Sequence, residues 1–235
     1  MEQRLVPSSW MVVLAKFRDA ASRRSWTIEA NDGIIATAGI LLGFARAGVS
    51  NRVLLFTAAA ATIAGAFSAG GAEWAEDAAE RESQLVLAEK EQREIATDPV
   101  AEVDELARYW EGKGLTPDVA HQVAQQLSAH DALAAQLDWE HGFEEPMSRF
   151  IPIWTGLTAA IAYMIGALIP LLITYFAPVR VEWWAILTAV LIALLLTSVA
   201  SARASHLLPT RMLARTIAVG AAMVAVSFVA GELLL

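Results

Sequence analysis

The sequence predicts an all-α membrane protein with five transmembrane helices and a helical cytoplasmic domain inserted between the second and the third. The hydrophobic fraction of 56% and the mean hydropathy of +0.47 exceed those of a usual soluble domain. Five stretches of about 20 apolar residues are each long enough to cross a hydrocarbon core. No stretch alternates between apolar and polar residues with a period of two, so no strand is predicted.

Residues 1–27 are predicted to form an amphipathic helix at the membrane surface, because Trp10 and Phe17 are accompanied by several basic residues. A disordered basic tail is the alternative. Residues 28–72 contain the first two spans, at about 28–47 and 53–72. No Gly or Pro stands between Ala72 and Thr97. The second span is therefore predicted to continue out of the membrane as one long helix.

Residues 73–145 form the predicted soluble domain, with three short helices after the long one. The starts and ends of these helices are marked, in order, by Asp98-Pro99, Gly112, Gly114, Thr116-Pro117, Asp131 and Gly142. Residues 146–235 hold the last three spans, at about 150–176, 183–202 and 214–234. Gly166 and Pro170 predict a kink in the first of these three.

The charges are concentrated in the soluble domain. Residues 73–145 contain 19 acids and 5 bases, a net charge of −14, which leaves +6 for the rest of a chain whose total is −8. This division favours a cation-handling protein and argues against nucleic acid as a partner. The alternative is that the acids only keep a small domain soluble. The chain has no Cys, which excludes thiolate metal sites and disulfides.

The distribution of basic residues predicts the orientation in the membrane. Five spans place the two termini on opposite sides, and the side of the N-terminus holds 14 of the 17 Lys and Arg residues. The positive-inside rule therefore puts the N-terminus and residues 73–145 in the cytoplasm, with the spans in the inner cell membrane.

Carboxylates in or next to the spans are candidates for an ion pathway, because a charge in lipid is costly. Asp32 lies near the start of the first span, beside Gly33; an Asp-Gly helix start at the interface is the alternative. One stripe of the second helix changes from small to acidic residues: Ala61, Gly65, Ala69, Glu73, Glu76 and Glu80. Glu73 and Glu76 are thus placed to collect cations at a pore mouth, unless they are simply solvated acids.

Two ExxE pairs, Glu91/Glu94 and Glu102/Glu105, flank the Asp98-Pro99 turn. Each pair places two carboxylates on one helix face, and a helical hairpin would bring the four together. They would then repel one another unless protons or a cation neutralise them. Hard oxygen ligands of this kind suit Mg²⁺, Mn²⁺, Ca²⁺ or Fe²⁺.

Other residues bear on this metal site. Glu140 can add a fifth oxygen, and Asp138 with His141 is a weaker alternative pair of ligands. The competing interpretation is a solvated helix face supported by ion pairs. Glu91 and Glu102 fit that interpretation poorly, because neither has a basic residue three or four positions away.

Several segments together resemble the vacuolar iron transporter family, over nearly the whole chain from about residue 28. In chain order they are NDGIIATAGILLGFARAG, GAFSAGGAEWAEDAAERES, EKEQREI, AEVDEL, LDWEHGFEEP and GALIPLLITYF. The resemblance implies a homodimer in the lipid bilayer whose pore lies on the two-fold axis. It also implies export of Fe²⁺, and often Mn²⁺, from the cytoplasm in exchange for protons. We therefore expect a transporter and not an enzyme.

The resemblance also assigns roles to residues. It implies cytoplasmic metal ligands at Glu91, Glu94, Glu102, Glu105 and Glu140, and a membrane carboxylate at Asp32. The family's pore glutamate and methionine correspond to Ala61 and Ala69, and the domain's methionine ligand corresponds to Gln136. These departures bear on proton coupling and on a preference for Fe²⁺. They leave open a membrane-anchored metal-binding or sensing protein that has lost transport.

Overall fold

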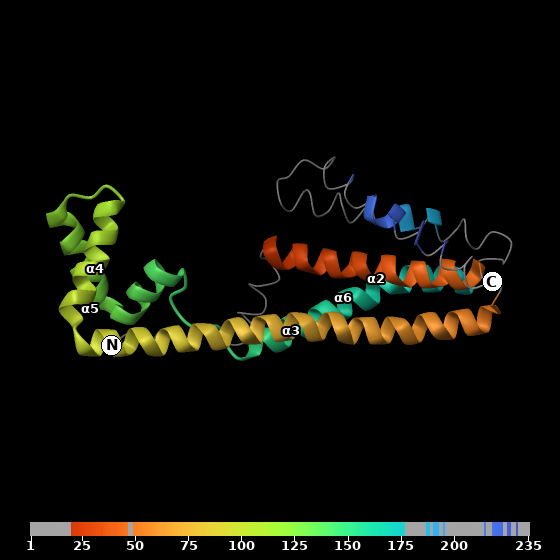
Figure 1. The fold of residues 1–235 in the computed structure, drawn as a ribbon, viewed down its shortest axis with the longest axis horizontal. Coiled ribbons are helices and arrows are strands. Elements are labelled where there is room, and N and C mark those ends of the chain that lie inside the picture. Colours follow the sequence, from red (N-terminus) through yellow and green to blue (C-terminus); the bar gives the residue numbers. More distant parts are fainter. Residues whose placement is uncertain are drawn as a thin grey trace. The chain divides into compact units, whose positions relative to one another are not determined.

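The structure is a computed structural model that describes residues 20–46 and 49–176, with a few residues between 187 and 229. Every regular element in this part of the chain is a helix, as predicted. The long helices and the short ones between them are α2 (Ala20–Arg46), α3 (Asn51–Thr97), α4 (Pro99–Gly112), α5 (Pro117–His141) and α6 (Phe150–Phe176) (Figure 1). The predicted surface helix before residue 20 and most of the spans at 183–202 and 214–234 lie outside the described residues.

Three of the described helices are long and apolar enough to cross a membrane: residues Ser25–Ala45 of α2, α3 and α6. They correspond to the first three predicted spans. α2 begins at Ala20, eight positions before the predicted first span, because no helix breaker stands in between. α3 is one helix of 47 residues, as the absence of Gly and Pro after Ala72 predicted. α6 continues through Pro170, and the kink there stays a prediction.

The chain divides into two compact units, residues 1–75 with 152–235, and residues 76–151. In the first unit, glycines permit close contact between helices. A Cβ on Gly33 of α2 would collide with the backbone carbonyl of Tyr163 on α6, and a Cβ on Gly70 of α3 would lie 2.6 Å from the carbonyl oxygen of Gly156. The hydroxyls of Thr37 and Thr62 form a buried hydrogen bond of 3.1 Å between α2 and α3.

The second unit contains the end of α3 together with α4 and α5. Asp98 caps α4 by accepting a hydrogen bond of 3.1 Å from the backbone N–H of Ala101. α5 is interrupted at Asp131, where the backbone is extended (φ −159°, ψ 95°) and the side chain caps the next turn at the N–H of Ala134. The helix ends at Gly142, which has a left-handed φ of +77°. The predicted order of short helices is therefore confirmed, including the restart at Asp131.

The small core of this unit lies between α4 and α5. Leu106, Ala107 and Ala124 are buried there, and Tyr109, Trp110 and Trp139 pack against them. The rings of Tyr109 and Trp139 lie 5.2 Å apart between centroids, so the C-terminal part of α5 is held against α4.

Replacing Gly33 with Ala tests the close contact between α2 and α6. The added Cβ has no space beside the Tyr163 carbonyl, so we expect Gly33→Ala to lower the stability of the detergent-solubilised chain by about 1–3 kcal/mol. Gly71→Ala is the matched control, because a Cβ at Gly71 meets no atom within 4 Å. Equal midpoints of thermal unfolding for the two variants would contradict the predicted contact.

Candidate metal site

The end of α3 supplies the first two carboxylates of the predicted site. Glu91 and Glu94 are three residues apart and so share one face of the helix. The Glu91 side chain is fully buried, whereas that of Glu94 is 45% exposed. A charged group is rarely buried without a partner, so the surroundings of Glu91 decide what this cluster can do.

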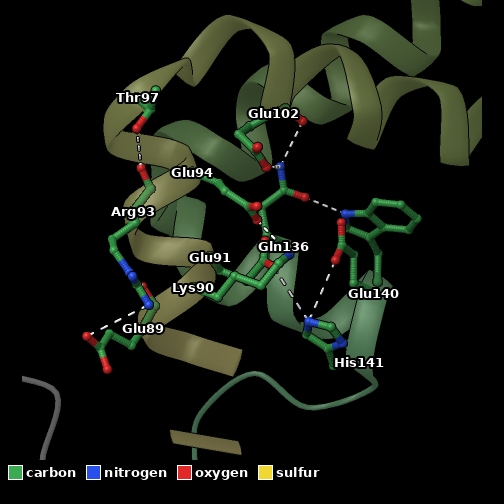
Figure 2. Close-up of polar contacts among 11 residues, drawn as sticks. Glu89, Lys90, Glu91, Arg93, Glu94, Thr97, Glu102, Gln136, Glu140 and His141 are labelled. Atoms are coloured by element: carbon green, nitrogen blue, oxygen red, sulfur yellow. Dashed lines mark hydrogen bonds and ion pairs between the residues drawn. The ribbon is translucent and has the colours of Figure 1, made fainter. Parts of the chain in front are cut away.

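Glu102 and Glu105 follow on the first two turns of α4, beyond the Asp98-Pro99 turn. Gln136 of α5 donates a hydrogen bond of 2.9 Å to the Glu102 carboxylate and one of 2.8 Å to the Glu102 backbone carbonyl. The Gln136 carbonyl oxygen in turn accepts a hydrogen bond from the Trp139 indole N–H. These bonds fix the orientation of the Glu102 carboxylate (Figure 2).

The last residues of α5 bring Glu140 and His141 to Glu91 (Figure 2). The Nε2 atom of His141 lies 3.6 Å from an oxygen of Glu91 and 3.6 Å from an oxygen of Glu140. One ligand atom from each of these three residues lies within 4.8 Å of the other two. Asp138, the alternative partner of His141 in the sequence, is exposed and is not part of this group.

The charges of the predicted carboxylates shift the pKa of two of them. Burial raises the pKa of Glu102, and the charges of the other four (Glu91, Glu105, Glu94 and Glu140) raise it further. Burial also raises the pKa of Glu140, followed by the charge of Glu91. Glu91 and Glu140 each offer an oxygen to one compact group, and the charges of Glu94 and Glu105 also act on Glu102; that the five form one metal site stays a prediction. Their mutual repulsion favours binding of protons or of a cation.

A lysine that the sequence analysis did not consider contacts two of these carboxylates. The Lys90 ammonium lies 3.1 Å from a Glu91 oxygen and 2.7 Å from a Glu94 oxygen. The pKa of Lys90 is raised, mainly by the hydrogen bond to Glu94 and then by the one to Glu91. The i,i+4 spacing of Lys90 and Glu94 was visible in the sequence. The contact with the adjacent Glu91 was not, because it depends on side-chain direction.

The outer side of the cluster borders a hollow and carries partly exposed carboxylates. A hollow of about 290 Å³ borders Glu102 and Gln136 on the side of Ile95 and Pro99, so solvent reaches the α4 side of the cluster. Glu105 is 44% exposed and pairs with Arg108 at 3.2 Å. Among the five predicted ligands, Glu105 and Glu94 are thus the outer ones and Glu91 is the innermost.

The predicted pathway residues of the first unit lie in the first half of α2 and in the middle of α3. Glu73 accepts a hydrogen bond of 3.2 Å from the Ser25 hydroxyl. Ser25, Glu29 and Asp32 follow one another at spacings of four and three and so share a face of α2. Asp32 is exposed in the single chain. Glu29 was missed by the sequence analysis, although its spacing from Asp32 was a usable signal.

Comparison with known proteins gives one family. The family model described as "VIT family" matches residues 23–232. A "Vacuolar iron transporter" of Acanthamoeba castellanii is 31% identical over 179 residues, which cover 76% of this chain and 64% of that protein. The "Vacuolar iron transporter 1" of Eucalyptus grandis is 27% identical over 208 residues, 87% of this chain and 83% of its own length. The chain thus spans less than two thirds of the amoebal relative.

The raised pKa values of Glu102 and Glu140 predict that protons compete with a bound metal at higher pH than for ordinary carboxylates. As the pH is lowered from neutral toward the range where ordinary carboxylates titrate, these groups take up protons first, so Mn²⁺ affinity should fall before ordinary carboxylates become protonated. Calorimetric titration of the full-length chain in two buffers measures the protons released. Mn²⁺ binding to the Glu102→Gln variant should release fewer protons than binding to the unmodified chain. A constant affinity over this range, with no proton release, would contradict the prediction.

Lys90 should compete with a divalent ion for Glu91 and Glu94. We expect Lys90→Gln to tighten Mn²⁺ binding by a few-fold, the modest scale of exposed ion pairs. Arg93→Gln removes the same charge from the same helix, where Arg93 pairs with Glu89 at 3.9 Å. If both variants tighten binding equally, the effect comes from overall charge and direct competition by Lys90 is wrong.

Proposed function

The chain belongs to the VIT family, and from this we propose that it carries divalent metal ions, Fe²⁺ and Mn²⁺ among them, across a membrane. The proposed protein has five transmembrane helices and forms a homodimer with its pore on the two-fold axis. Residues 76–151 lie in the cytoplasm and collect the ion there. In this proposal, the protein exports the metal ion from the cytoplasm in exchange for protons.

One observation supports metal capture more than any other. The carboxylate of Glu91 is fully buried, and the charges around it raise the pKa of both Glu102 and Glu140. A divalent cation would neutralise this repulsion while satisfying several oxygen atoms at once. The relatives named above are called iron transporters, which agrees with a divalent metal as the cargo.

The membrane part of the proposal rests on Asp32. Glu76 and Glu73, earlier on α3 than the capture site, would pass the ion toward α2, where Asp32 would bind it together with the Asp32 of a second copy. The exposure of Asp32 in the single chain leaves it accessible to that copy. Phe56 and Phe67 of α3 are 77% and 78% exposed, as expected for a face covered by lipid or by another chain.

A second function is favoured by Ala61 and Ala69. These residues provide no ligand at the two positions of α3 where the family resemblance implies a pore carboxylate and a thioether. A membrane-anchored protein that binds or senses metal without transporting it would need neither. Metal binding agrees with both functions, so only flux separates them.

Replacing Asp32 with Asn tests the transport route. In reconstituted vesicles, Asp32→Asn should abolish Mn²⁺ flux, because a neutral amide binds the dication far less well than a carboxylate does. Metal binding at Glu91 and its neighbours in the solubilised variant should be unchanged. Asp118→Asn, on the first turn of α5, is the control and should transport as the unmodified chain does.

Two results would oppose this route. Full flux through Asp32→Asn would remove Asp32 from the pathway. No flux through the unmodified chain, despite tight Mn²⁺ binding, would favour the sensing protein.

A further inference from the structure

We propose that His141 is a ligand of the captured ion, through Nε2, together with one oxygen each from Glu91 and Glu140. This inference rests on the proposed metal capture by residues 76–151 and adds a nitrogen to a site otherwise made of carboxylates. None of the five glutamates that the sequence assigned to the site provides such a donor.

The first support is a pair of buried polar atoms without hydrogen bonds. Four buried side-chain atoms of the described residues have no hydrogen-bond partner, and two of them, Oε2 of Glu91 and Nε2 of His141, belong to this group. The nearest oxygens to Nε2 of His141, one each from Glu91 and Glu140, are 3.6 Å away. Glu91 has no exposed side-chain surface, and Lys90 contacts only its other oxygen. Buried polar atoms are nearly always satisfied, so two unpartnered ones in the same group indicate a missing ligand.

The second support is spacing. The three donor atoms all lie within 4.8 Å of one another. Two ligand atoms on opposite sides of a first-row metal ion lie about 4.2 Å apart, because each bond is about 2.1 Å long. Small side-chain rotations therefore suffice to bring all three donors to a single ion.

The third support is the way α5 presents the imidazole. Asp131 restarts the helix and Gly142 ends it, so His141 is its last residue. The ring stacks on Phe143, with centroids 6.1 Å apart and planes inclined by 22°. The C-terminal end of a helix carries partial negative charge and favours a nearby cation. The ring is thus held in place at a position suited to a metal ion.

Gln136 does not provide this extra ligand. It stands where the resemblance implies a methionine ligand, but both ends of its amide are occupied. The amide nitrogen donates to Glu102, and the amide oxygen accepts from Trp139. Gln136 therefore positions Glu102, while the histidine supplies the donor that is softer than oxygen.

A nitrogen ligand changes which ions the site prefers. Imidazole suits Fe²⁺, Co²⁺ and Zn²⁺, whereas Mg²⁺ and Ca²⁺ favour sites made of oxygen alone. With His141 as a ligand, the capture site discriminates against these two common ions. Five glutamates alone would not do so.

Pulsed electron paramagnetic resonance of Mn²⁺ bound to the full-length chain detects a nitrogen ligand directly. We expect a nitrogen modulation that changes when the histidines are labelled with ¹⁵N and that disappears in His141→Gln. The same variant should bind Co²⁺ at least about tenfold more weakly, with a smaller effect on Ca²⁺. His121→Gln is the matched control, because His121 also lies 3.6 Å from one carboxylate, that of Asp104.

The outcomes separate this inference from the proposed function. If the unmodified chain binds Mn²⁺ without a modulation that responds to histidine labelling, His141 is not a ligand although capture stands. If it binds neither Mn²⁺ nor Co²⁺, metal capture itself is wrong. The labelling experiment needs no variant, so a folding defect in His141→Gln would not obscure the result. His141→Glu should bind Mn²⁺ but lack the nitrogen signal.

Discussion

The burial of the Glu91 carboxylate among other carboxylates is the constraint on which the second unit depends. Glu91 has no exposed side-chain surface, and its charge raises the pKa of both Glu102 and Glu140. The helix ends serve this arrangement: Asp98 starts α4 beside the end of α3, Asp131 restarts α5, and Gly142 ends it. Lys90 pairs with one oxygen of Glu91 and leaves the other without a hydrogen bond, so a bound cation would further stabilise this buried carboxylate.

The helices of this unit were predictable because their signals are local. Proline at the first turn, a capping Asp and a glycine at a helix end act within a few residues, and Asp98, Asp131 and Gly142 act as their sequence positions indicated. The convergence of the ExxE pairs followed from the same signals. The contacts of His141 with Glu91 were not predictable, because they join residues 50 positions apart in the sequence and depend on how α5 packs.

In the first unit, small residues make the closest contacts between helices. Gly33 and Gly70 allow the backbones of α2 and α3 to approach α6, and a buried pair of threonine hydroxyls joins α2 to α3. The contact of Gly33 with Tyr163 joins residues 130 positions apart, so local sequence signals could not predict it. Asp32, next to Gly33, remains on the exposed side. The same turn of α2 thus packs against α6 and leaves a carboxylate available to another chain.

The location of a bound ion tests the central claim most directly. A crystal of the full-length chain grown with Mn²⁺ and measured at the manganese absorption edge would locate the ion by its anomalous scattering. The account predicts a peak within bonding distance of Glu91, between α3 and the last turn of α5. A fully occupied Mn²⁺ peak elsewhere in residues 76–151, with the Glu91 carboxylate turned into solvent, would contradict it.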